Sequence, residues 1–99
     1  MSHYIKSLEN AQYMKAAESY SILFFTDKKV EIKTRPMKFF APILEKSGWY
    51  KIHKSFIVNP LYVKNLTEER DMICLASGEE LPISRRKQKD VIKWRLALK

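Results

Sequence analysis

The sequence of 99 residues contains a single cysteine, Cys74, so no disulfide can form within the chain. Cys74 lies in an apolar run, residues 72–76, which favours a small buried side chain in a strand over a reactive thiol, because a reactive thiol needs an accessible, electropositive setting. The two histidines, His3 and His53, are far apart, and no Cys or His pair has the spacing of metal ligands. We therefore expect no metal ion and no cofactor.

Glycine and proline are also scarce, with two and four residues respectively. This scarcity, together with a hydrophobic content of 45%, argues against a low-complexity chain and indicates one folded domain. No apolar run approaches the roughly 18 residues that cross a bilayer, and residues 1–6 lack the apolar core of a signal peptide. We expect a cytoplasmic protein with no membrane partner.

Acidic residues are outnumbered, with 11 Asp and Glu against 19 Lys and Arg, and the net charge is +8. The surplus is concentrated in residues 84–99, where seven basic residues and one acidic residue give a net charge of +6. Such a segment favours polyanions and indicates nucleic acid. From charge alone, a solvated helix face, a ribosomal role and a membrane-surface role stay open.

Aromatic, β-branched and alternating residues predict strands along most of the chain. A polar turn at residues 27–29 joins two strands into a hairpin, and Val30 and Ile32 should form the half-buried face of its second strand. Ser77 and Gly78 mark the turn of another hairpin. The expected strands are residues 13–17, 20–26, 30–34, 49–54, 56–58, 62–67, 70–76 and 80–84.

Residues 36–47 have the spacing of a small helix, which Pro36 opens and Gly48 ends. Pro42 lies inside this segment and predicts a helix that is short or irregular. The apolar residues at helical spacing are Met37, Phe40, Ile43 and Leu44.

Residues 87–98 predict an amphipathic C-terminal helix with Val91, Trp94 and Leu98 on one face. The whole pattern indicates a mostly-β domain with a short internal helix and a C-terminal helix. We expect four aromatic side chains in the core rather than on a stacking platform: Phe24, Phe25, Phe56 and Trp94.

Two short motifs carry a family resemblance. Residues 51–59 read Lys-Ile-His-Lys-Ser-Phe-Ile-Val-Asn, and residues 78–86 read Gly-Glu-Glu-Leu-Pro-Ile-Ser-Arg-Arg. Both resemble signatures of LytTR-type DNA-binding domains, and Tyr13 to Ala16 with Ser19 and Tyr20 resembles that family's first strand and loop. The resemblance runs from about Tyr4 to Arg95 and implies a domain over residues 4–97, with Asn10 and Ala11 as minor departures. Members of this family usually follow a receiver or sensory domain, and no segment of this sequence resembles such a domain.

The resemblance implies an elongated antiparallel multi-sheet fold that binds double-stranded DNA in bacterial transcription regulation, as in response regulators of two-component systems. Its loops would enter adjacent major grooves at imperfect direct repeats in promoters, with a second copy on the DNA. It implies no enzymatic activity and no small-molecule substrate. The residues also lack paired carboxylates and a Gly-rich phosphate loop.

In the second motif, Arg85 matches the family position that reaches the major groove, and an Arg fork suits the edge of a guanine. A phosphate contact or an exposed salt bridge is the alternative. Arg86 either touches phosphate or packs beneath the loop. Ser84 either donates to a phosphate or caps the following helix.

In the first motif, Lys54 matches another contact position and can bind a base or a phosphate. Lys51 and Lys87 are expected to neutralise phosphates, with Lys89 beside Lys87. His53 and Ser55 are expected to stabilise the turn by hydrogen bonds, and Asn59 is expected to satisfy local backbone groups.

The first loop contributes the remaining candidates. Tyr20 aligns with a position that can insert toward bases, but an aromatic at a strand start can equally belong to the core. Ser19 can bond phosphate. The alternative function is an RNA or single-strand binding module, which would need exposed aromatics on a sheet face.

Overall fold

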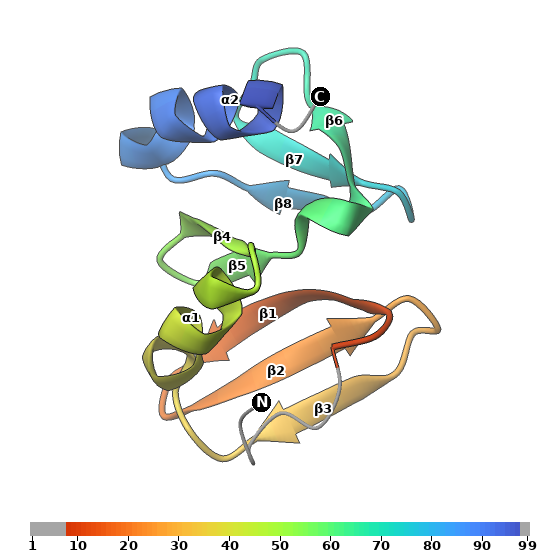
Figure 1. Cartoon of the computed structure of the whole chain (residues 1–99), viewed down its shortest axis with the longest axis vertical. Helices are drawn as coiled ribbons and strands as arrows, with labels where there is room; N and C mark the ends of the chain where they lie inside the picture. Colours follow the sequence, from red (N-terminus) through yellow and green to blue (C-terminus); the bar gives the residue numbers. More distant parts are fainter. Residues whose placement is uncertain (1–7, 98–99) are drawn as a thin grey trace.

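The computed structural model describes residues 8–97, which form two antiparallel sheets and two helices (Figure 1). The five-stranded sheet has the order β3-β2-β1-β5-β4, and the three-stranded sheet has the order β6-β7-β8. The first sheet contains β1 (Ala11–Ala17), β2 (Tyr20–Phe25), β3 (Val30–Lys33), β4 (Tyr50–His53) and β5 (Phe56–Val58). The second contains β6 (Val63–Leu66), β7 (Met72–Leu75) and β8 (Glu80–Pro82). The helices are α1 (Met37–Lys46) and α2 (Gln88–Ala97), and the 3₁₀ turns are η1 (Pro60–Tyr62) and η2 (Arg85–Lys87).

This architecture confirms the predicted mostly-β fold with a short internal helix and a C-terminal helix. The principal extents of 36 × 26 × 21 Å describe an elongated molecule. In Figure 1 the second sheet and α2 lie above the first sheet, and α1 lies beside its lower part. Neither helix among the described residues has the length and hydropathy to cross a bilayer.

Two apolar clusters cover the two faces of the five-stranded sheet. One cluster joins α1 to β1, β2 and β5 through side chains such as Met14, Leu23 and Phe40. The other joins β1, β4 and β5 to the second sheet and α2 through side chains such as Ile52, Ile73 and Val91. Since successive residues of a strand point to opposite faces, Met14 and Tyr13 serve different clusters. The sheet is therefore a shared wall between two cores.

Helix α1 begins after Pro36 and ends at a glycine, as the sequence predicts. Gly48 has φ +93° and donates its N–H to Glu45 O (3.0 Å), while the Trp49 N–H donates to Leu44 O (3.1 Å). This pair of bonds is the Schellman stop of a helix. Of the two expectations drawn from Pro42, the short helix is confirmed, since α1 has 10 residues, and the irregular helix was wrong, because α1 is continuous. Pro42 is exposed, so water can reach the carbonyl that its missing N–H leaves free.

The prediction that β3 has a half-buried face was also wrong. Val30 and Ile32 are 50% and 66% exposed. Strand β3 is the edge of its sheet, and neither apolar cluster includes a residue of it. Apolar and charged residues alternate along β3, but neither face of this strand packs against an apolar cluster.

Cys74 is in a strand, as predicted, but it is only half-buried. Its neighbours Ile73 and Leu75 point into the second cluster, so Cys74 points to the other face of the sheet. Its Sγ lies 3.6 Å from Glu80 Oε2. Desolvation and the Glu80 carboxylate raise the pKa of this thiol, which keeps it protonated and unreactive at neutral pH.

The aromatic side chains predicted as core lie at the margins of the two clusters. Phe24, Phe25, Phe56 and Trp94 are half-buried and pack against the clusters. Phe24 stacks on Tyr13 at 4.5 Å between ring centroids, and Trp94 stacks on Tyr50 at 4.7 Å. On the predicted face of α2, Val91 is fully buried, whereas Leu98 lies outside the described residues.

Asn59 stands where the chain leaves the first sheet for the second. Its Oδ1 accepts the Leu61 N–H (3.0 Å), which is the local turn bond expected from the sequence. Its buried Nδ2 also donates to Ala11 O (2.8 Å), and its backbone N–H donates to Gln12 O (2.8 Å). Asn59 thus fixes the junction of the sheets to the start of β1.

Candidate nucleic-acid interface

Three chain connections lie on one long side of the molecule, at the ends of strands on the left of Figure 1. They are the β1–β2 turn, the β4–β5 turn and the link from β8 through η2 to α2. The sequence motifs predicted contact residues in each of these connections. The first two come from one sheet and the third follows the other, so tertiary packing alone brings them together.

The β1–β2 turn exposes Glu18, Ser19 and Tyr20. Glu18 has φ +57°, the left-handed conformation that closes a two-residue turn between Ala17 and Tyr20. Tyr20 is 42% exposed and belongs to neither apolar cluster, so its ring is not a core side chain. The Ala16 N–H donates to Ser55 O (2.8 Å) and so ties this turn to the next.

The β4–β5 turn presents Lys54 to solvent. His53 stabilises the turn, as predicted, because its Nδ1 accepts the Ser55 N–H (3.0 Å). The His53 ring packs edge-on against Phe56 at 5.7 Å between centroids. Lys54 is therefore an exposed cation on a turn that hydrogen bonds hold in place.

The third connection is attached to the first sheet by a backbone bond from the Ser84 N–H to Ile52 O (2.9 Å). Arg85 and Arg86 follow on η2 and are exposed. The Ser84 side chain makes no capping bond to this turn, so of its two predicted roles the capping role was wrong. Lys87 is half-buried, with Nζ 5.9 Å from the centre of the Tyr50 ring.

Burial raises the pKa of the Tyr50 hydroxyl, and the carboxylates of Asp90 and Glu45 raise it further. The ring that supports Lys87 is therefore neutral at physiological pH.

Two hollows join the three connections into one surface. The first, of about 470 Å³, includes Ser19, Lys51 and Lys54 in its lining. The second, of about 500 Å³, is lined by Lys51 and Lys54 again, together with His53 and residues 84–87. Lys51 and Lys54 thus form the ridge between the hollows. Seven of the eight predicted contact residues line this surface, and Tyr20 is the direct neighbour of Ser19.

Sequence reasoning missed one cation of this surface, Lys38, which lines the first hollow. The available signal was its place in the first turn of α1, off the buried face that Met37 and Phe40 define. The surface carries six cations and one acid, Glu18. Among residues 8–97, no ion pair engages any of these six: Lys38, Lys51, Lys54, Arg85, Arg86 and Lys87.

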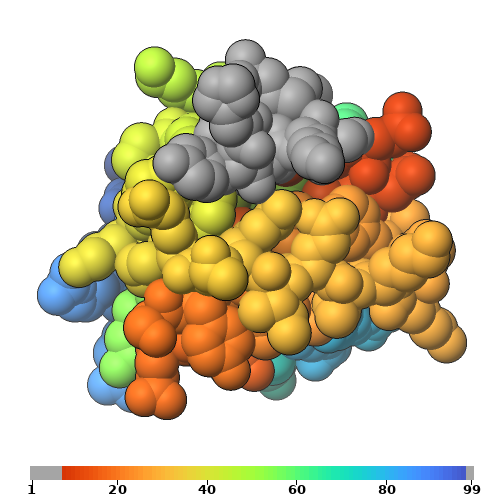
Figure 2. Space-filling model, turned by 90° about the horizontal axis from the view of Figure 1, so that it is seen from below, coloured from red at the N-terminus to blue at the C-terminus, as the bar shows by residue number. Residues whose placement is uncertain are grey.

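Figure 2 shows the molecule from below, with parts of these segments along its left side. Orange atoms from the first turn, green atoms from the second and blue atoms from the α2 region appear there together, with yellow atoms from the α1 region above them. Parts of the three connections therefore lie along one side of the molecule.

Comparison with known proteins matches the LytTr DNA-binding domain family to residues 2–95. The chain belongs to this family. A solved LytTr DNA-binding domain, from a Bacillus cereus protein named as a methyl-accepting/DNA response regulator, has the same fold, with a TM-score of 0.70 and 20% identity. That match covers 92% of this chain and 83% of the other. No curated protein matches the sequence.

LytTr domains are DNA-binding domains of bacterial regulators, so this chain is a DNA-binding domain that acts in transcription regulation.

Proposed function

We propose that this LytTr domain is a sequence-specific binder of double-stranded DNA that uses its three clustered connections as reading tips. The tips would enter adjacent major grooves on one side of the duplex, at imperfect direct repeats in promoters of a bacterial genome, in the cytoplasm. The observation that carries this proposal is the continuity of the two hollows through Lys51 and Lys54, since one duplex can meet all three tips only if they share a surface.

Arg85 is the residue proposed to read a base. It is exposed at the start of η2, and it forms no ion pair with any other residue that the structure describes. Its backbone is anchored, because the preceding residue Ser84 bonds to β4. A guanidinium on a fixed backbone can place two donors on the O6 and N7 of one guanine.

Lys54 is proposed to reach a base or phosphate from the turn that His53 stabilises. At the first turn, Ser19 and the exposed ring of Tyr20 would meet the neighbouring groove. The phosphate contacts would come from Lys51, Arg86 and Lys87, with the Ser84 hydroxyl as a neutral donor.

We propose no enzymatic activity for this surface. Its functional groups are cations, hydroxyls, the single carboxylate of Glu18 and the imidazole of His53. The Nδ1 of His53 already accepts the Ser55 N–H, so the set suits phosphate binding rather than group transfer. A second copy on the DNA would serve the second repeat.

The competing proposal, RNA or single-strand binding, finds little support in the aromatic side chains. Stacking platforms need several exposed rings on a sheet face. Among the described residues Tyr20 is the one exposed aromatic, at 42%, and the rings of Tyr13, Phe24 and Phe56 pack into the second cluster.

The decisive experiment is selection of bound duplexes from a random pool, followed by competition with single strands. We expect two similarly oriented half-sites, and we expect the selected duplex to outcompete either of its separated strands and the matching RNA. Recovery of no consensus, or preference for a single strand, would refute the proposal.

A further inference from the structure

A third hollow, of about 410 Å³, lies away from the basic tips, between the β6–β7 hairpin and α2. Ligand sites of small molecules fall in this range of volumes and combine apolar walls with a few polar groups. The hairpin contributes Asn65, Leu66, Thr67, Glu68 and Arg70, and the helix contributes Ile92, Arg95 and Leu96.

Arg95 has an incomplete set of hydrogen bonds. Its Nη2 donates to Lys64 O (2.6 Å), which holds the guanidinium against β6. Its Nε is buried and has no hydrogen-bond partner among residues 8–97. A buried charged donor without an acceptor is costly and calls for an explanation. An anionic oxygen settling between α2 and β6 would supply the missing acceptor.

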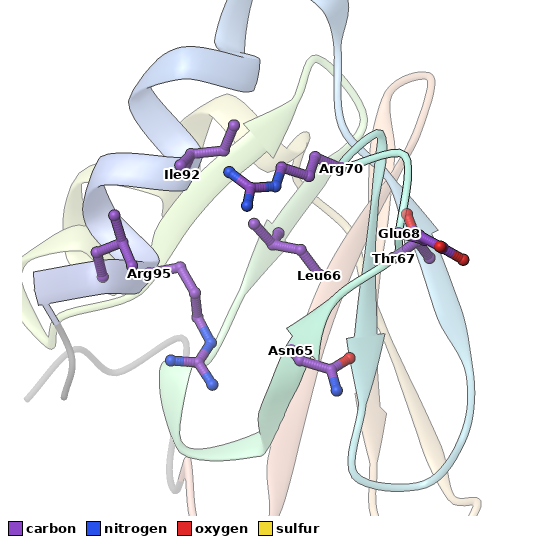
Figure 3. A pocket seen from close by; sticks show the side chains of 8 residues that line it. Asn65, Leu66, Thr67, Glu68, Arg70, Ile92 and Arg95 are labelled. Carbon is purple, nitrogen blue, oxygen red and sulfur yellow. The ribbon is translucent and has the colours of Figure 1, made fainter.

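Arg70 provides a second guanidinium on the other side of the hollow. Figure 3 shows Arg70 and Arg95 on either side of Leu66, with Arg70 extending from the hairpin into the space below Ile92. Arg70 adopts φ +62°, so the hairpin loop holds it in the left-handed conformation. Glu68, the acidic residue of the lining, lies on the far side of the hairpin and points away from α2.

The remaining walls are apolar. Leu66 is half-buried, Ile92 is half-buried, and Leu96 is 60% exposed. A large exposed apolar side chain next to two guanidinium groups suits a ligand that has both an apolar body and a negative charge. Inorganic phosphate would use the arginines alone, and a neutral apolar molecule would use the leucines alone.

We propose that this hollow binds a small carboxylate with an apolar body, with Arg70 and Arg95 holding the carboxylate and Leu66, Ile92 and Leu96 packing on the apolar part. The site is separate from the DNA surface, which lies around η2 at the opposite end of α2. The ligand is one that the domain binds and leaves chemically unchanged.

The experiment titrates 2-naphthoate into the isotopically labelled protein and follows amide and arginine Nε–H signals by NMR. Saturable shifts should cluster in residues 64–70 and 92–96, with the Arg95 Nε–H signal among the largest. The expected dissociation constant is on the order of 1 mM or tighter, as for a ligand of this size. Neutral 2-naphthamide and inorganic phosphate should each bind at least about tenfold more weakly.

Two variants test the residue roles. Arg70→Gln removes the exposed guanidinium, and Arg95→Lys keeps a charge but removes Nε–H; each should weaken naphthoate binding about tenfold. Lys93→Gln is the matched control, because it removes an exposed charge from α2 outside the hollow and should leave binding within about twofold.

A melting curve shows that each variant is folded. Equal loss in Lys93→Gln, equal shifts with naphthamide, or naphthoate shifts centred on residues 84–87 would each overturn the proposal. The last of these would mean that the anion only samples the DNA surface.

Discussion

The two ends of this LytTr domain use cations in opposite ways. At the end with the tips, six cations meet a single carboxylate and form no ion pairs among the described residues. At the other end, on the right of Figure 1, the β2–β3 and β7–β8 turns meet in a hollow of about 380 Å³. There Lys29 pairs with Asp27 (3.9 Å), and Tyr13 Oη donates to Glu79 Oε2 (2.6 Å).

This difference suggests that residues at one end of the fold serve stability and that residues at the other end serve binding. At the far end, Lys29 pairs with Asp27 and Tyr13 bonds to Glu79, whereas the cations at the tips have no ion-pair partner among the described residues. A substitution at the tips should therefore cost DNA affinity with little stability, and one at the far end should do the reverse.

The largest expected effect comes from salt. If five to nine phosphates are neutralised, log affinity should fall with log salt at a slope on the order of −4 to −8. Between 50 and 200 mM salt this is a loss of hundreds-fold or more. Fluorescence anisotropy with a selected duplex measures the slope, and a flat response would contradict a phosphate-binding surface.

The next effect is that of Arg85→Ala. It should lose roughly 1–3 kcal/mol on a specific site and relax the preference at one base pair, because Arg85 is proposed to hold a guanine edge. Lys29→Ala, which removes a cation from the far end, is the control and should bind normally. Equal loss on specific and random duplexes would reduce Arg85 to a phosphate contact.

A smaller effect is expected for Lys51→Gln, on the ridge between the two hollows. It should weaken binding about fivefold at physiological salt on every sequence and bring the salt slope nearer to zero by about one. The same measurement on Lys29→Gln should show no change in slope. A base-specific defect in Lys51→Gln would place this residue in the groove instead.

We expect Tyr13→Phe to have no effect on DNA binding. Burial of Tyr13, followed by its bond to Glu79 and the charge of that carboxylate, raises the pKa of Tyr13 above its usual value. The unfolded chain loses this proton near pH 10 while the folded protein keeps it, so stability falls as pH rises above about 10.

Tyr13→Phe should therefore cost about 1 kcal/mol at neutral pH and flatten this alkaline loss, while DNA affinity stays unchanged. Urea unfolding at pH 8 and at higher pH provides the measurement. An undiminished alkaline loss in the variant would assign the effect to other groups.

Much of the fold could be predicted from the sequence, because the features that define its turns and helix ends are local. The turn residues, the helical spacing of α1 and its stop at Gly48 each depend on a few neighbouring residues. The exposure of Ile32 could not be predicted. The second apolar cluster reaches Phe24 on β2 and includes no residue of β3, and the alternation of residues along β3 does not reveal this limit. The exposure of Cys74 to the outer face was missed for a related reason, because a short apolar run does not show which face is covered.

The candidate site was predictable residue by residue but not as a surface. The motifs indicated Arg85 and Lys54, yet the bond from Ser84 to Ile52 that brings them together joins residues 32 positions apart. The place of Lys38 on this surface and the hollow beside Arg95 were missed, because both result from the packing of α1 and α2 against strands that are distant in the sequence.

The buried side chain of Asn59 fixes the junction between the two sheets. The tip that carries Arg85 belongs to the second sheet, and the tips of Ser19 and Lys54 belong to the first, so their spacing depends on how the sheets are joined. That joint includes one buried amide bonded to Ala11 O and to the Leu61 N–H. If the tips bind one duplex as proposed, the angle at which the domain meets the DNA is therefore set in part by a buried side chain that does not touch the DNA.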